Sequence, residues 1–120
     1  HRLNTSINSA ETCNNAQLPP LLLQPVVENA IKFGLYDTTE EVTIQINAQC
    51  ENGYLNIVVT NPFDPETSPD RKGTGFGLSA VQRRLYLLFG RQDLLAVHTE
   101  NNHYITTIII PQIYANRHTD

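Results

Sequence analysis

The sequence predicts an α+β domain, a two-layer α/β sandwich in which two helices cover one face of a mixed, mostly antiparallel sheet. Two pairs of alternating apolar segments, at 42–59 and 94–111, indicate hairpins. Two segments with helical periodicity, 21–34 and 78–89, separate the predicted strands. A short alternating segment at 1–9 predicts the first strand. The 120 residues are expected to form one domain, since this length suffices for a two-layer core.

The first hairpin has complete alternation of apolar and polar residues on its first strand. Asn52-Gly53 separates its two strands and is typical of a type I′ turn, because both residues tolerate positive φ. A second antiparallel pair is expected at 94–99 and 104–111, joined by a turn at 100–103. The expected core face of the first hairpin carries Val42, Ile44, Ile46, Ala48, Cys50, Leu55, Ile57 and Val59.

The first helix is predicted at Leu21–Gly34, LLLQPVVENAIKFG, with Gly34 as its stop. Pro25 predicts that the helix either begins near this residue or kinks there. The expected apolar stripe is Val26, Val27, Ala30 and Ile31, and the expected polar side is Gln24, Glu28, Asn29 and Lys32. The polar side has two interpretations. It is a solvated face with a Glu28–Lys32 pair, or a site where carboxylate, amide and ammonium meet a metal and phosphates.

Residues 62–75 are rich in proline and glycine and show no strand or helix pattern, so they predict a long functional or disordered loop. The second helix follows at 78–89 and is expected to end at Gly90. Its expected apolar stripe is Leu78, Val81, Leu85 and Leu88.

Three alternating glycines, Gly73, Gly75 and Gly77, precede this second helix. Backbone amides without a neighbouring Cβ, next to a helix N-terminus, can bind phosphate, although a hinge or tight turn gives the same pattern. Residues 71–91 carry a net charge of +5, whereas residues 1–70 carry −7. This basic block predicts a local anion site. A nucleic-acid surface is disfavoured, because the acidic remainder would repel a polyanion.

The two cysteines, Cys13 and Cys50, fit no metal-binding or disulfide pattern, and Cys50 is expected to be a small buried hydrophobe. No apolar run approaches the length of a membrane span, and no signal peptide is expected. A reduced, cytoplasmic setting follows. The absence of an initial methionine suggests a fragment of a longer protein.

Two motifs together resemble the GHKL superfamily of ATP-binding domains. QPVVENAIKFG resembles the N box, and KGTGFGL resembles the G2 box, in the family's order and with a hairpin between them. The longer stretches LPPLLLQPVVENAIKFG and GFGLSAVQRRLYLLFG are similar to LytS/YehU-like sensor histidine kinases. The resemblance extends from Leu18 to Pro111 and implies the GHKL (Bergerat) fold.

The resemblance implies roles for the residues that match these boxes. Asn29 would coordinate the Mg²⁺ that bridges the ATP phosphates, and Glu28 would orient or deprotonate the attacking group. Lys32 would contact phosphate as a point charge. Arg84 would either reach phosphate or pack structurally. Residues 62–77 would form an ATP lid, with nucleotide contacts from Lys72, Gly73, Thr74, Gly75, Gly77 and Leu78.

Asn61 stands where the family's G1 box has an aspartate that accepts a hydrogen bond from the adenine amino group, and the glycines of that box are missing. An amide oxygen can still accept this bond but is uncharged, so the affinity is expected to fall by about 1–2 kcal/mol. One alternative is therefore a degenerate GHKL domain, a pseudokinase or interaction module with weak or no nucleotide binding. Another is a GHKL kinase that phosphorylates serine.

The function that the resemblance implies is that of the catalytic ATP-binding domain of a two-component sensor histidine kinase. The phosphoacceptor histidine is expected outside this chain, because His1, His98, His103 and His118 lie in no helical pattern. The expected partners are the dimerisation domain that carries that histidine and a response regulator of the LytTR type. The full-length protein is expected to be a homodimer anchored in the inner membrane. This domain would lie in the cytoplasm, without direct contact to membrane or nucleic acid.

Overall fold

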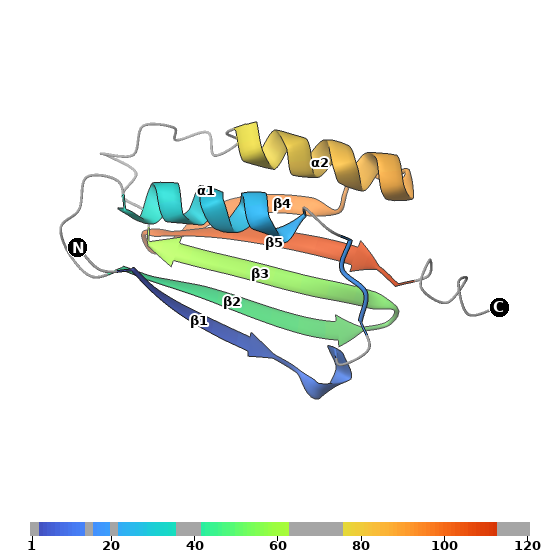
Figure 1. Cartoon of the computed structure of the whole chain (residues 1–120), viewed down its shortest axis with the longest axis horizontal. Helices are drawn as coiled ribbons and strands as arrows, with labels where there is room; N and C mark the ends of the chain where they lie inside the picture. The colour runs from blue at the N-terminus through green and yellow to red at the C-terminus, as the bar shows by residue number, and fades with distance from the viewer. Residues whose placement is uncertain (1–2, 14–15, 20–21, 36–41, 63–75, 113–120) are drawn as a thin grey trace.

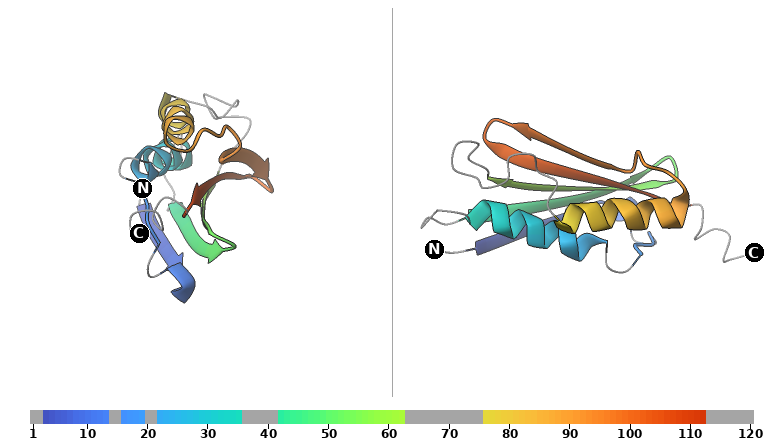
Figure 2. Two further views of the ribbon diagram at one scale, coloured as in Figure 1. Left: turned by 90° about the vertical axis from the view of Figure 1, so that its right-hand side faces the viewer. Right: turned by 90° about the horizontal axis from the view of Figure 1, so that it is seen from above.

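The computed structural model describes residues 3–13, 16–19, 22–35, 42–62 and 76–112. Both helices lie on one face of a five-stranded sheet (Figures 1 and 2), so the predicted two-layer α+β sandwich is confirmed. The elements in chain order are β1 (Leu3–Ser9), the 3₁₀ helix η1 (Glu11–Cys13), α1 (Leu23–Leu35), β2 (Val42–Glu51), β3 (Tyr54–Pro62), α2 (Phe76–Phe89), β4 (Leu95–Glu100) and β5 (His103–Pro111).

The strands follow the order β1-β2-β3-β5-β4 across the sheet. β1 runs parallel to β2, and the other three pairings are antiparallel. Each hairpin closes through two residues with positive φ, Asn52 (55°) and Gly53 (82°) in the first, and Asn101 (52°) and Asn102 (62°) in the second. These are the conformations that a type I′ turn requires. Such short turns leave no freedom in the register of either hairpin.

The core lies between the helices and the sheet. β3 alternates strictly between buried and half-buried residues, which is the period of two expected for a strand with one covered face. Ala48 and Cys50, predicted to face the core, are half-buried. The buried apolar residues are Leu22, Val26, Ala30, Ile44, Ile46, Leu55, Ile57, Val59, Leu78, Val81, Leu85, Leu94, Tyr104, Ile108 and Ile110.

α1 begins at Leu23, which places Pro25 in its first turn. A proline there breaks no helical hydrogen bond, because the first amides of a helix have no intrahelical acceptor. The helix continues to Leu35, so the prediction that it stops at Gly34 is wrong.

α2 begins at Phe76, two residues earlier than predicted, and ends where Gly90 adopts a positive φ of 70° and donates its N–H to the carbonyl of Tyr86 at 2.7 Å. Leu78, Val81 and Leu85 are buried as predicted. Leu88 is 55% exposed, so its place in the apolar stripe is wrong. The half-buried Phe89 packs against the core instead. On this helix the next position on the buried side after Leu85 is i+4, which is Phe89, and not i+3, which is Leu88.

The predicted frayed tail at 112–120 does not begin at Gln112. Its backbone N–H donates to the carbonyl of Gly53 at 2.8 Å, and its side-chain amide bonds both backbone groups of Gln17, at 2.7 and 3.0 Å. The rest of the tail, 113–120, lies outside the described residues, as does most of the predicted lid, 63–75. Within the part of the chain that the structure describes, no helix is long and apolar enough to cross a membrane.

Candidate nucleotide site

Asn29 lies on the buried side of α1, which corrects the prediction that it shares the polar face. Leu22, Val26 and Asn29 recur at the i, i+4, i+7 spacing of one helix face, and Asn29 is only 8% exposed. Its Nδ2 atom is buried and has no hydrogen-bond partner among the described residues. An amide in an apolar stripe is costly unless a donor or acceptor reaches it. The solvated-face interpretation is therefore wrong for Asn29.

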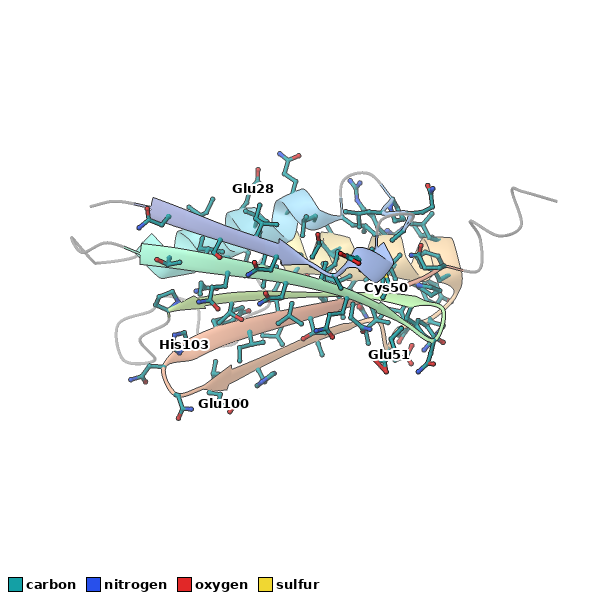
Figure 3. All side chains as sticks on the ribbon, turned by 90° about the horizontal axis from the view of Figure 1, so that it is seen from below. Glu28, Cys50, Glu51, Glu100 and His103 are labelled. Carbon is teal, nitrogen blue, oxygen red and sulfur yellow. The ribbon has the colours of Figure 1, made fainter. Side chains whose placement is uncertain are left out.

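Glu28 and Lys32, in contrast, are exposed. The carboxylate of Glu28 accepts a hydrogen bond from Nε2 of Gln24 at 3.1 Å, and Figure 3 shows Glu28 at the solvent margin of α1. Among the described residues, Glu28 forms no ion pair with Lys32, so the predicted i,i+4 pair is absent. Both side chains therefore remain accessible to a ligand at the surface of α1.

Asn61 is 1% exposed and lies one residue before the end of β3. Its Nδ2 donates to the carbonyl of Pro62 at 2.7 Å. Its Oδ1 is buried and has no partner within the described part of the chain. The Nδ2 bond fixes the orientation of the amide, because the opposite orientation would bring two oxygens together. Asn61 thus offers a single hydrogen-bond acceptor to any ligand that reaches it.

Tyr104 is the residue near this site that the sequence did not indicate. It lies directly opposite Asn61 in the antiparallel pairing of β3 with β5, and it is 1% exposed. Directly opposed side chains on one face of a sheet are about 5 Å apart at Cβ, so Tyr104 adjoins Asn61. The turn signal in Asn101-Asn102 fixes the register of β5 against β4, but only the pairing of β3 with β5 reveals this contact.

The other predicted site residues divide into two groups. Gly77 and Leu78 lie in the first turn of α2, where helix N–H groups are free to bind anions, and Leu78 is buried at 2% exposure. Arg84 lies nearly two turns further along α2 and is exposed. The predicted lid contacts Lys72, Gly73, Thr74 and Gly75 lie outside the described residues.

α1 and α2 lie side by side over the sheet, and α2 begins beside the middle of α1 (Figures 1 and 2). Asn29 is the middle residue of α1, and Asn61 lies at the end of β3. α1 packs against both β3 and α2. The packing of α1 thus connects the helix that carries Asn29 with the strand that carries Asn61 and with α2.

The basic block predicted from the sequence is not a single cluster. Arg91 lies past the other end of α2, where its guanidinium donates to both carboxylate oxygens of Asp93 at 2.9 and 2.8 Å. It also donates to the hydroxyl of Tyr54 at 3.0 Å. The hydrogen bonds from Arg91 lower the pKa of Asp93 below its usual value. Arg91 is therefore separate from the candidate site.

A second amide, Gln82, shares the arrangement of Asn61 but lies elsewhere. Its Nε2 donates to the carbonyl of Gln92 at 2.7 Å, and its buried Oε1 has no partner among the described residues. It lines a hollow of about 400 Å³ between α2 and β4, together with Leu78, Ser79, Leu95 and Val97. Because neither Asn29 nor Asn61 lines this hollow, Gln82 provides an internal comparison for Asn61.

Comparison with known proteins links these features to one protein class. No family model matches the chain. It is 30% identical to the sensor histidine kinase YesM of Bacillus subtilis over 103 residues, which are 83% of this chain and 18% of that protein. It is also 30% identical to the sensor histidine kinase BtsS of Escherichia coli over 106 residues, which are 86% of this chain and 18% of that protein. The sensor protein LytS of Oceanobacillus iheyensis is 26% identical over 123 residues, with coverage of 92% and 21%.

The chain is homologous to the sensor histidine kinases. It spans about a fifth of the length of these curated relatives. The fold agrees, since the blue-light activated histidine kinase of Erythrobacter litoralis superposes with a TM-score of 0.69 at 19% identity, over 98% of this chain and 37% of that one. The catalytic domain of histidine kinase ThkA superposes with a TM-score of 0.62 at 18% identity, over 92% of this chain and 78% of that one.

These relatives confirm the resemblance to LytS-like sensor kinases that the N and G2 boxes indicate. For this histidine-kinase-like domain, the described residues contain no group of three or more His, Cys, Asp or Glu side chains that would hold a metal ion.

Proposed function

We propose that this domain binds Mg·ATP at a site that includes Asn29 and Asn61, and that it supplies the γ-phosphoryl group to a histidine outside this chain. Homology to sensor histidine kinases supports the class of reaction. The observation that carries the proposal is the buried Oδ1 of Asn61, which has no hydrogen-bond partner among the described residues. Leaving such an atom unpaired costs about 1–3 kcal/mol, so a donor that reaches it binds favourably.

The fixed orientation of Asn61 selects the kind of base. Because one Nδ2 hydrogen is held by the carbonyl of Pro62, the orientation of the amide is set and its Oδ1 remains as the unpaired acceptor among the described residues. Adenine presents an amino group, a donor, at its six position, whereas guanine and hypoxanthine present a carbonyl oxygen there. Asn61 would therefore accept a bond from adenine and repel the other two purines. The proposed nucleotide is accordingly an adenine nucleotide.

Asn29 fits the metal and phosphate end of the site. Its amide is buried on α1, and its Nδ2 lacks a partner among the described residues. The terminal torsion of asparagine is broad, so the amide can turn its oxygen, a hard ligand, toward Mg²⁺. When bound, Mg²⁺ would neutralise charge on the phosphate oxygens.

The surrounding residues would position and neutralise the phosphate chain. Lys32, exposed one turn from Asn29, would act as a flexible positive charge, and the free N–H groups at Gly77 and Leu78 would add donors. Glu28 would orient or deprotonate the incoming histidine. We assign further lid contacts to Lys72, Gly73, Thr74 and Gly75, and a phosphate or packing role to Arg84.

The longer protein would be a two-component sensor kinase. We propose that the phosphoacceptor histidine lies on a dimerisation domain, and that a response regulator of the LytTR type receives the phosphoryl group. The protein would be a homodimer in the inner membrane with this domain in the cytoplasm. The names of the relatives, all sensor proteins or sensor kinases, support this arrangement.

The site is tested by titration calorimetry with ATP, in MgCl₂ and in EDTA, on the wild-type chain and on Asn29→Ala. We expect saturable binding that weakens in EDTA and is lost in the variant, while the melting temperature of the variant stays within a few degrees. Unchanged affinity in Asn29→Ala would remove Asn29 from the site. If millimolar ATP and ADP give neither heat nor a thermal shift, the degenerate interaction module replaces the kinase. Phosphate on serine instead of histidine in the longer protein would indicate a serine kinase.

A further inference from the structure

Two cysteines that are far apart in the sequence meet at the C-terminal end of β2. Cys13 ends the 3₁₀ helix η1, and Cys50 is the penultimate residue of β2. Figure 3 shows the labelled Cys50 beside η1. Both thiols are free and half-buried. The 3₁₀ helix η1 packs against β2, and the side chain of Cys13 is a neighbour that influences the Cys50 thiol.

Backbone hydrogen bonds hold the two cysteines together. The N–H of Ala10 donates to the carbonyl of Ala48 at 3.1 Å, which fixes the start of η1 against β2. The N–H of Cys13 donates to the carbonyl of Ala10 at 3.0 Å, which completes the turn that carries the thiol. Both side chains also pack against the hydrophobic core. The contact therefore belongs to the folded framework and needs no further rearrangement to form.

We propose that Cys13 and Cys50 are a site of oxidative modification, at which a peroxide converts the two thiols into an intramolecular disulfide. The thiolate of Cys13 attacks one peroxide oxygen, which gives a sulfenic acid and releases the first water after protonation. The sulfur of Cys50 then attacks the sulfenic sulfur, loses its proton, and the second water leaves. Two thiols are oxidised, one peroxide is reduced, and one S–S bond forms.

The order of these steps follows from the environment of Cys50. Burial, reinforced by the contact with Cys13, raises the pKa of the Cys50 thiol to about 11. Since the thiolate is the reactive form, Cys50 is a poor initial nucleophile at neutral pH. Its position against Cys13 instead suits it to close the bond once the sulfenic acid has formed.

The disulfide would close a loop that contains the whole of α1, and with it Asn29. Cross-linking a loop of this length restricts the unfolded chain and raises the melting temperature of a domain of this size by about 10 °C. The effect is independent of whether the domain binds a nucleotide.

The test treats the 120-residue chain with hydrogen peroxide and follows free thiols, intact mass and melting temperature. We expect both thiols to disappear, a mass loss of about 2 Da, a cross-linked peptide that joins Cys13 to Cys50, and a higher melting temperature that dithiothreitol reverses. Cys13→Ser and Cys50→Ser serve as matched controls, and neither should gain stability from peroxide. Two persistent thiols, disulfide-linked dimers, or oxygen added to separate cysteines would overturn the proposal, as would a disulfide that does not raise the melting temperature.

Discussion

Replacing Asn61 with leucine separates the contribution of one buried acceptor from the rest of the nucleotide site. Leucine is close to asparagine in size and shape. It removes the Nδ2 bond to the carbonyl of Pro62 and also Oδ1, which has no partner in the described part of the chain. In the wild-type chain, ATP would donate from its amino group to Oδ1. Inosine triphosphate has a carbonyl in place of this amino group at the six position. It would therefore place its carbonyl oxygen, an acceptor, against Oδ1 of Asn61, which is also an acceptor.

The magnitude follows from the burial of the acceptor. At 1% exposure Asn61 has no water to compensate a mismatched base, so the unpaired groups cost about 1–3 kcal/mol. This free energy corresponds to a preference for ATP over inosine triphosphate of about 5- to 150-fold. In Asn61→Leu the affinity for ATP should fall by this factor. The affinity for inosine triphosphate should change little, so the preference should collapse to within about threefold of unity.

Gln82→Leu is the matched control for this experiment. Gln82 has the same arrangement, a side-chain N–H held at 2.7 Å by a carbonyl and a buried oxygen without a partner among the described residues. It lies in the hollow between α2 and β4, so its replacement should alter stability by a similar amount while leaving the base preference intact. Calorimetric titration of both nucleotides against the three proteins gives the result. An unchanged preference in Asn61→Leu, or an equal loss in Gln82→Leu, would refute the assignment of Asn61 to the base.

Three further predictions concern other parts of the domain. In the longer protein, Glu28→Gln should leave the affinity for ATP unchanged in calorimetry. If Glu28 acts as a base, the variant should phosphorylate the acceptor histidine about 10²- to 10⁴-fold more slowly. An unaltered rate would remove that role. Leu85→Ala should lower the free energy of unfolding by about 2–5 kcal/mol in urea, whereas Leu88→Ala, at a residue 55% exposed, should change it by less than about 1 kcal/mol; equal losses would restore the predicted stripe. Folding raises the pKa of the Cys50 thiol from 9.0 to about 11. The protonated thiol therefore contributes fully to the stability of the fold below pH 9, and this contribution is lost between pH 9 and pH 11. Over this range the free energy of unfolding should fall more for the wild type than for Cys50→Ser. Parallel pH curves for the two proteins would contradict this assignment.

The strands could be predicted from the sequence because their burial depends on local alternation. Residues of the first hairpin such as Ile44 and Val59 are buried as expected, and Asn52-Gly53 adopts the positive φ values that its composition predicts. The pattern repeats every two residues, so one strand and one turn determine which side faces the core. Fold class follows from the same local patterns combined with the two helices.

The helix faces were harder to predict, because a helix can contain more apolar residues than its buried face needs. Val27 and Ile31 shifted the expected stripe of α1 away from Asn29, although both are only half-buried. In α2 several apolar residues follow one another near the C-terminus, and the predicted stripe included Leu88, which is exposed. A polar residue within a buried stripe, such as Asn29, cannot be recognised by periodicity, because periodicity counts apolar residues only.

Contacts between distant segments could not be predicted from local patterns at all. The pairing of β3 with β5 places Tyr104 against Asn61, and the parallel pairing of β1 with β2 brings η1, with Cys13, to Cys50. Both contacts depend on the order of strands in the sheet. The sequence showed each residue but not its neighbour.

Side-chain amide NMR tests whether Asn29 and Asn61 hold one and the same nucleotide. In ¹⁵N-labelled protein titrated with ATP and MgCl₂, the amide resonances of Asn29 and Asn61 should shift together and report one dissociation constant. The amide of Gln112, which is held by the carbonyls of Gln17 and Ile110 at 3.0 and 3.2 Å, should stay in place as an internal control. Shifts at only one asparagine, two different dissociation constants, or no shift at saturating ATP would contradict the claim.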